Sequence, residues 1–250
     1  MAVIPGKPLA TPLPTPERGD SLELAIAALA RGEPVLLFDD PGREAETDIV
    51  LLAEKATPQK IRLMREEAGG LLCVTMPLGL VSRIGLGYQH DLLEELGAKH
   101  AVLGKLIPKS LPYDRRSAFG IWVNSRDTFT GVTDRDRSAT ISAVGRFVRD
   151  SEGQKDGELT DRFSREFLVP GHVPLLHPSP GLLRERRGHT ELSTALAQMG
   201  HLTPSLALME MLGEDGGALP RREALERARS RGWAFVDGKE LTQAWLRWSV

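Results

Sequence analysis

Cysteine is nearly absent from this 250-residue chain, because Cys73 is the only one. A single thiol cannot form a disulfide within the chain, so the main mark of a protein that folds in an oxidising compartment is missing. We therefore expect a cytoplasmic protein. A chain of this length can bury a large core without any such cross-link.

Long apolar runs are also lacking, since no stretch approaches the ~18 consecutive apolar residues of a membrane-spanning helix. The first nineteen residues, MAVIPGKPLATPLPTPERG, hold five prolines and have no continuous apolar core like that of a secretion signal. We expect no association with a membrane. Residues 1–19 are predicted to be a flexible proline-rich arm, followed by one domain over 20–250.

The chain has no strong excess of either charge, with 32 basic and 34 acidic residues and a net charge of -2. Such a chain produces no overall field that would gather nucleic acid or an anionic membrane surface. Any anion must therefore bind at a local site, and we expect no nucleic-acid partner.

Short apolar runs alternate with amphipathic segments along most of the sequence, which predicts an α/β fold. The expected architecture is a single domain with a mixed β-sheet flanked by helices. Strands are predicted at 34–40, 48–56, 71–76, 119–124, 205–212 and 233–237, and helices at 20–32, 58–68, 138–150, 189–199, 220–232 and 241–248.

Two stretches give weaker patterns. Residues 79–116 show helical periodicity around 79–86 and 89–98 and then a loop rich in proline and lysine, which indicates an insertion or a long crossing loop. Residues 167–183 contain so many prolines and glycines that we expect turns joining short strands.

The segment between the first two predicted strands concentrates charge. Glu44, Glu46 and Asp48 occupy alternate positions after Arg43, and alternate residues of an extended loop point the same way. Hard divalent cations such as Mg²⁺ prefer carboxylate and substrate oxygens. The pattern therefore indicates a metal site, although a solvated acidic turn would give the same sequence.

A second polar cluster opens the helix predicted at 189–199. Arg186, Arg187 and Gly188 precede His189 and Thr190, and a helix N-terminus beside a guanidinium and a hydroxyl can bind phosphate. A basic surface turn capped by threonine is the alternative interpretation.

Three single residues have two interpretations each. Glu210 interrupts an apolar strand, where an acid is costly unless it is paired or functional. His172 lies in a turn after Gly171, where a histidine is more often structural than a base. Cys73 is most simply a small core residue.

Six segments in order resemble 3,4-dihydroxy-2-butanone 4-phosphate synthase of the archaeal, single-domain type. They are DDPGREAETDIVLLAE, AGGLLCVTMP, TFTGVTDRDRSATI, PGHVPLL, RRGHTEL and MEML. The resemblance runs from about residue 20 to 245. It implies a lyase of riboflavin biosynthesis that converts D-ribulose 5-phosphate to 3,4-dihydroxy-2-butanone 4-phosphate and formate. It also implies Mg²⁺, with Mn²⁺ as an alternative, and a homodimer with active sites at the interface.

The resemblance assigns roles by position. Glu44 and His189 would hold the metal, while Arg43, Glu44, Asp48 and Glu210 would contact the sugar phosphate. Arg186, Thr190 and Thr130 would hold the phosphate group. His172 and Glu210 would be the essential catalytic pair, with Glu46 and Asp48 of the acidic loop as further catalytic groups.

These roles suit metal-assisted enolisation, dehydration, skeletal rearrangement and loss of formate, because each proton transfer needs an acid or base beside the sugar. The residues alone also fit another metal-dependent sugar-phosphate enzyme, such as an isomerase or aldolase. A nucleic-acid-binding module that uses the arginines at 115–116 and 184–187 is a third alternative, which the near-neutral charge disfavours. The chain departs from many relatives at Pro41-Gly42, Gly181-Leu182 and Asp114–Arg116.

Overall fold

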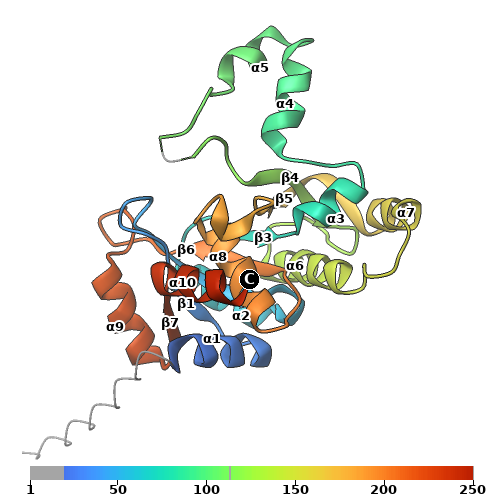
Figure 1. Cartoon of the computed structure of the whole chain (residues 1–250). Coiled ribbons are helices and arrows are strands. Elements are labelled where there is room, and N and C mark those ends of the chain that lie inside the picture. Colours follow the sequence, from blue (N-terminus) through green and yellow to red (C-terminus); the bar gives the residue numbers. More distant parts are fainter. Residues whose placement is uncertain (1–19, 113, 250) are drawn as a thin grey trace, which may run out of the picture.

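The computed structural model describes residues 20–112 and 114–249 (Figure 1). The arm predicted over residues 1–19 lies outside the described residues. Seven strands form one mixed sheet in the order β4-β5-β3-β6-β2-β1-β7. They are β1 (Val35–Phe38), β2 (Thr47–Leu52), β3 (Cys73–Thr75), β4 (Phe119–Ser125), β5 (Phe167–Leu176), β6 (Leu206–Glu210) and β7 (Ala234–Asp237). The predicted α/β class is confirmed.

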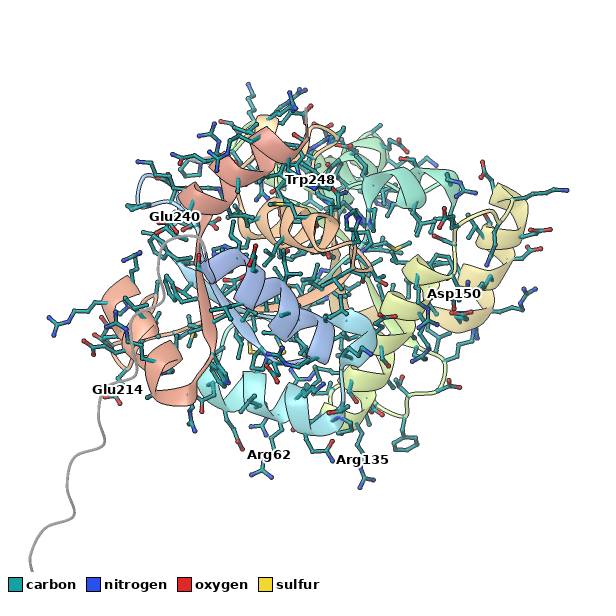
Figure 2. All side chains as sticks on the ribbon, turned by 60° about the horizontal axis from the view of Figure 1, so that its bottom comes forward. Arg62, Arg135, Asp150, Glu214, Glu240 and Trp248 are labelled. Atoms are coloured by element: carbon teal, nitrogen blue, oxygen red, sulfur yellow. The ribbon has the colours of Figure 1, made fainter. Side chains whose placement is uncertain are left out.

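Helices cover both faces of this sheet, as expected, apart from α4 (Gln89–Gly97) and α5 (Ala101–Leu106). The other helices within the described ranges are α1 (Asp20–Arg31), α2 (Pro58–Glu67), α3 (Leu78–Arg83), α6 (Asp134–Arg149), α7 (Asp156–Glu166), α8 (His189–Met199), α9 (Arg221–Arg231) and α10 (Gly238–Trp248). Charged side chains such as Arg62 of α2 and Arg135 of α6 project outward from the helices (Figure 2).

The alternation of side chains along β2 divides the core into two apolar clusters. Ile49 and Leu51 pack in one cluster with residues of α2, α6, α7 and α9. Val50 packs in the other with residues of α1, α8 and α10. Successive strand residues point to opposite faces, so Asp48, two positions before Val50, belongs to the face that α8 covers.

The segment 167–183 differs from the prediction. Residues 167–176 form one strand, β5, which pairs with β4 despite Pro170 and Gly171. The pairing is irregular here, with register shifts between Phe119 and Trp122 and between Val123 and Asn124. Irregular ladders tolerate proline and glycine, and Gly171 allows β5 to approach Val123 so closely that a Cβ would lie 1.9 Å from its carbonyl carbon.

Helical structure is more extensive than predicted around residues 134–166. Thr133 caps α6 by accepting a hydrogen bond from the Asp136 N–H at 3.1 Å, so this helix begins four residues before the predicted start. The polar stretch that follows forms α7, which contributes buried Leu159 and partly buried Phe163 to the core. Two apolar contacts in an otherwise polar helix are too weak a pattern to reveal it.

The stretch 79–116 forms α3 and then a helical pair, α4 and α5, that projects from the body of the molecule (Figure 1). Neither α4 nor α5 contains a buried residue. The two helices meet at Gly97 and Gly104, where a Cβ on Gly97 would lie 3.1 Å from the Gly104 Cα. The chain then returns through residues 107–118 to β4.

Candidate active site

The loop between β1 and β2 folds around the buried carboxylate of Asp39. Asp39 accepts hydrogen bonds from the backbone N–H of Glu46 at 3.0 Å, from that of Glu44 at 3.2 Å and from Arg43 Nη1 at 3.3 Å. Ala45 completes the turn with φ +57°. Asp39 therefore fixes the direction in which the acidic loop presents its side chains.

His189 is the first residue of α8, and its imidazole enters this loop. Nδ1 lies 3.8 Å from Glu44 Oε2, and Nε2 lies 3.6 Å from Asp48 Oδ1 and 3.2 Å from the Glu46 carbonyl oxygen. Four residues predicted from sequence for the site thus lie together, although they come from a loop and a helix far apart in the chain.

Burial and neighbouring charges shift the pKa values of the cluster in opposite directions. Burial favours the neutral form of Glu44, but nearby His189 and the charge and hydrogen bond of Arg43 outweigh it and lower the Glu44 pKa to about 2. For His189, burial opposes ionisation, yet Asp48, Glu44 and Asp39 raise its pKa to about 9. Burial raises the pKa of Asp48 to about 7, with His189 opposing the shift and Glu210 adding to it.

The same residues fit a divalent metal ion. One ligand atom each from Asp39, Glu44 and His189 lies within 4.8 Å of the other two. In the described ranges, the buried Asp48 Oδ1 accepts no hydrogen bond. A buried acceptor without a hydrogen bond is costly, and carboxylate oxygens with one imidazole suit a small dication. Asp39 already accepts three hydrogen bonds, so Glu44 and His189 are the better placed ligands.

Glu210 adjoins the cluster at the end of β6. Its Cα is paired with that of Asp48 across β2 and β6, and residues directly opposite each other point to the same face. Burial raises the pKa of the Cys73 thiol, and the charges of Glu210 and Asp48 raise it further. Cys73 is therefore a buried thiol near the two acids.

Arg43 and Arg186 complete the polar site near the start of α8. Arg43 pairs with Glu44 and, at 2.7 Å, with Asp114. Arg186 pairs with the same Asp114 at 2.8 Å and with Glu191 at 2.6 Å. Thr190 is buried beside His189.

Thr130 and His172 belong to a second group on the β4–β5 side of the sheet, where β3 lies between β5 and β6. The Asn124 side chain contacts His172, with its Oδ1 accepting from the His172 N–H at 2.9 Å. Asn124 also packs over Gly131, where a Cβ would lie 2.3 Å from its Nδ2. Thr130 hydrogen-bonds to Asp136 through both its N–H and its hydroxyl.

Sequence reasoning missed Asp39, Asp114 and Asn124. Asp39 ends an apolar strand next to a second acid, a pattern that signals a functional carboxylate without saying which atoms it binds. Asp114 and Asn124 contact site residues 71 and 48 positions away, respectively. No local pattern identifies such long-range partners.

Comparison with known proteins identifies the family of this chain. A sequence profile of the 3,4-dihydroxy-2-butanone 4-phosphate synthase family matches residues 23–244. The chain is 42% identical over 226 residues to the 3,4-dihydroxy-2-butanone 4-phosphate synthase of Methanothermobacter thermautotrophicus, with 90% of this chain and 96% of that protein covered. This chain belongs to the 3,4-dihydroxy-2-butanone 4-phosphate synthase family.

Two further relatives of this synthase family extend the comparison. The enzyme of that name from Archaeoglobus fulgidus is 40% identical over 88% of this chain and 92% of its own. A crystal structure of 3,4-dihydroxy-2-butanone 4-phosphate synthase in complex with two magnesium ions superposes with a TM-score of 0.68 at 22% identity, covering 89% of this chain and 94% of the other. At that identity the superposition shows that the fold is shared.

Proposed function

We propose that this protein converts D-ribulose 5-phosphate to 3,4-dihydroxy-2-butanone 4-phosphate and formate, a step of riboflavin biosynthesis. The observation that carries the proposal is the convergence of Glu44, Asp48 and His189 in a chain that belongs to the synthase family. The five carbons of the substrate divide into four and one, and the atoms balance without an added oxidant or reductant.

Glu44 and His189 would hold the metal ion, with Mg²⁺ as the first candidate and Mn²⁺ as the alternative. A bound dication would polarise the substrate carbonyl and stabilise a developing enediolate. A related structure contains magnesium ions, and the donor set here has the oxygen-rich chemistry that Mg²⁺ prefers.

The protein's own side chains would bind the substrate and move its protons. Arg43, Arg186 and Thr190 would bind and orient the sugar phosphate at the start of α8. Asp48, with a pKa of about 7, can both accept and donate a proton at neutral pH. Glu46 and Glu210, whose charges both act on Asp48, would be further carboxylates for proton transfer.

His172 and Thr130 would reach the reaction from a second subunit. Both belong to the Asn124 group rather than to the Glu44–His189 cluster, and both are exposed. Large apolar side chains nearby in sequence are exposed as well, with Phe129 97%, Val132 53% and Val169 59% accessible. A homodimer would bury such a surface and bring His172 and Thr130 of one protomer to the acidic cluster of its partner.

The cellular location also stays a proposal. No helix within residues 20–112 and 114–249 is long and apolar enough to cross a bilayer. The cytoplasm is proposed because the single cysteine leaves no internal disulfide to maintain.

Formate release tests the proposed function directly. Purified protein is incubated with ribulose 5-phosphate and Mg²⁺, and formate is measured before and after addition of a chelator. We expect formate that depends on the metal and disappears in Glu44→Gln. Conversion to another pentose phosphate without formate would instead identify an isomerase, and cleavage to shorter phosphates without formate would identify an aldolase.

A further inference from the structure

One oxygen of Asp114 binds two arginines at once. Asp114 Oδ2 lies 2.7 Å from Arg43 Nη2 and 2.8 Å from Arg186 Nε. The three side chains are largely buried, at 12%, 9% and 18% accessible respectively. Charge-assisted hydrogen bonds of this length and burial are strong contacts, so Asp114 is firmly held.

The two guanidinium groups converge over the first turn of α8. A Cβ on Gly188, which precedes this helix, would lie 2.7 Å from Arg186 Nη1 and 2.9 Å from Arg43 Nη2. Two cations at the N-terminus of an eleven-residue helix make a position that favours an anion. Arg43 also pairs with Asp39 and Glu44, and Arg186 with Glu191, but Asp114 is the acid whose carboxylate bridges the two guanidinium groups.

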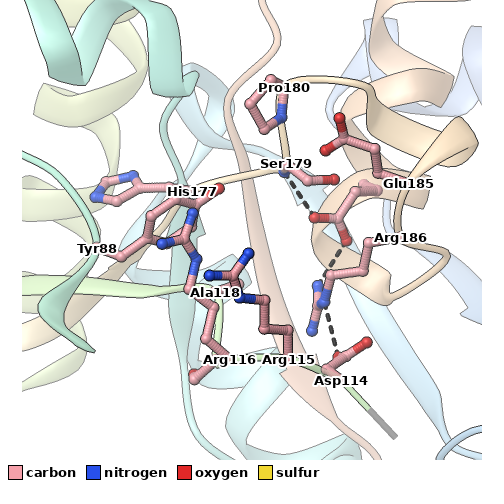
Figure 3. A pocket seen from close by; sticks show the side chains of 12 residues that line it. Tyr88, Asp114, Arg115, Arg116, Ala118, His177, Ser179, Pro180, Glu185 and Arg186 are labelled. Atoms are coloured by element: carbon pink, nitrogen blue, oxygen red, sulfur yellow. Dashed lines mark hydrogen bonds and ion pairs between the residues drawn. The ribbon is translucent and has the colours of Figure 1, made fainter. Parts of the chain in front are cut away.

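Asp114 comes from the connection between a projecting helix and the edge of the sheet. It lies on the return from α5 to β4, beside a cavity of about 270 Å³ that Arg115, Arg116 and Ser179 also line (Figure 3). Figure 3 shows Asp114 joined to Arg186. Arg186 also donates a hydrogen bond through Nη1 to Glu191, which in turn accepts one from the Ser179 N–H. Arg116, two residues on, is held separately by Asp91 at 2.8 Å.

We infer that Asp114 is an internal competitor of the substrate's phosphate group, because its carboxylate binds both arginines that would bind the phosphate. The inference rests on the proposed function, which assigns Arg43 and Arg186 to the sugar phosphate. A phosphate dianion that binds through Arg43 Nη2 and Arg186 Nε would displace Asp114 Oδ2 from both hydrogen bonds. Its observed affinity is therefore the intrinsic affinity reduced by the fraction of protein in which Asp114 has withdrawn.

This competition discriminates between ligands by how strongly they bind the two arginines. A dianion offers two charges and several oxygens to the two guanidiniums, whereas Asp114 offers one charge from a single shared oxygen. A phosphate ester anchored through its sugar at the acidic cluster displaces the carboxylate more readily than free phosphate does. Asp114 thus lowers the affinity for inorganic phosphate, which would otherwise fill the site.

Asp114→Asn tests the inference with inorganic phosphate as the probe. The variant keeps the size of the side chain and removes its charge. We expect calorimetry to show inorganic phosphate binding about tenfold more tightly than to the wild type, within the range usual for coupled sites. The KM for ribulose 5-phosphate should also be lower in the variant than in the wild type.

Asp91→Asn is the matched control, because Asp91 holds Arg116 of the same return segment. This control should bind phosphate with wild-type affinity. Weaker or unchanged binding by Asp114→Asn would overturn the inference, and weaker binding would mean that Asp114 positions the arginines for the ligand.

A measurement on the wild type covers the case in which Asp114→Asn does not fold. Saturating phosphate should increase amide hydrogen exchange at residues 114–118 if the carboxylate withdraws, and decreased exchange there would contradict the inference. These readouts need no turnover. Failure of the wild type to release formate would therefore refute the proposed function separately.

Discussion

The carboxylate of Glu210 accepts a hydrogen bond from the backbone N–H of Leu71 at 2.7 Å. This contact ties the end of β6 to the chain entering β3. It depends on Gly70, where a Cβ would lie 2.5 Å from Glu210 Oε2 and 2.6 Å from the Glu210 carbonyl oxygen. The absence of a side chain at Gly70 therefore allows the Glu210 carboxylate to reach the Leu71 N–H and fixes its orientation.

Gly70→Ala should displace Glu210 and reduce activity. The added methyl group meets both the carboxylate and the backbone of Glu210, and overpacking of this kind costs about 1–3 kcal/mol. We expect at least a tenfold loss in kcat, measured by formate release, together with a lower urea midpoint.

Gly79→Ala is the control for that substitution. Gly79 lies in α3 with no atom within 4 Å of a Cβ position, and alanine is the better helix former by about 1 kcal/mol. Wild-type kcat with equal or higher stability is expected. Full activity in Gly70→Ala would show that the contact with Leu71 does not position Glu210.

Mixing two inactive variants tests whether active sites are shared between subunits. Glu44→Gln removes a ligand of the proposed metal, and His172→Ala removes the histidine of the Asn124 group. A mixed dimer contains one site free of both substitutions, so activity should return after the variants are unfolded and refolded together. Size-exclusion chromatography with light scattering confirms the dimer, and absence of recovery in mixed dimers would place both residues in one subunit's site.

The sequence contained enough information for the class of fold and for half of the site. Alternating apolar runs predicted the sheet and most helices, because burial on one face imposes that period. The acids at 44, 46 and 48 stood out because a short loop between two buried strands has no packing need for them. Their contacts with His189 are long-range and followed only from the family resemblance.

Other features had no local signal. Asp39 holds the acidic loop by accepting hydrogen bonds from Arg43, Glu44 and Glu46, and these donors reach it only after the loop has folded. The strand β5 was hidden by Pro170 and Gly171, which usually mark turns but here fit an irregular ladder. Asp114 meets Arg43 and Arg186 only because the chain returns from α5 across the site.

Buried His177 should make folding stability depend on pH. Burial lowers its pKa to about 4, although a hydrogen bond to the Met76 carbonyl oxygen opposes the shift. The unfolded chain binds a proton below about pH 6.5 while the folded protein does not. Stability is therefore complete above that pH and falls by about 2 kcal/mol from pH 7 to pH 5 through this group.

Urea unfolding of His177→Gln at both pH values checks this expectation. The substitution should lower the free energy of unfolding at both pH values through lost packing. It should also remove the part of the decrease between pH 7 and pH 5 that His177 causes. His201→Gln, which changes an exposed histidine, should keep the wild-type dependence. An unchanged dependence in His177→Gln would mean that other groups cause it.

Magnesium should stabilise the folded protein through Glu44 and His189. A ligand that binds only the native state raises the melting temperature as its concentration rises above its Kd. We expect a rise with millimolar Mg²⁺ in the wild type that a chelator reverses. Glu44→Gln should show no rise, whereas Glu54→Gln, which changes an acid paired with Arg149 away from the cluster, should respond like the wild type.

The fate of one carbon atom tests the central claim most directly. Ribulose 5-phosphate labelled with ¹³C at C4 is incubated with the protein and Mg²⁺, and the products are followed by ¹³C NMR. The proposed reaction places the label in formate and leaves the four-carbon phosphate unlabelled. Label retained in a sugar phosphate, with no labelled formate, would contradict the assignment of this site to 3,4-dihydroxy-2-butanone 4-phosphate synthesis.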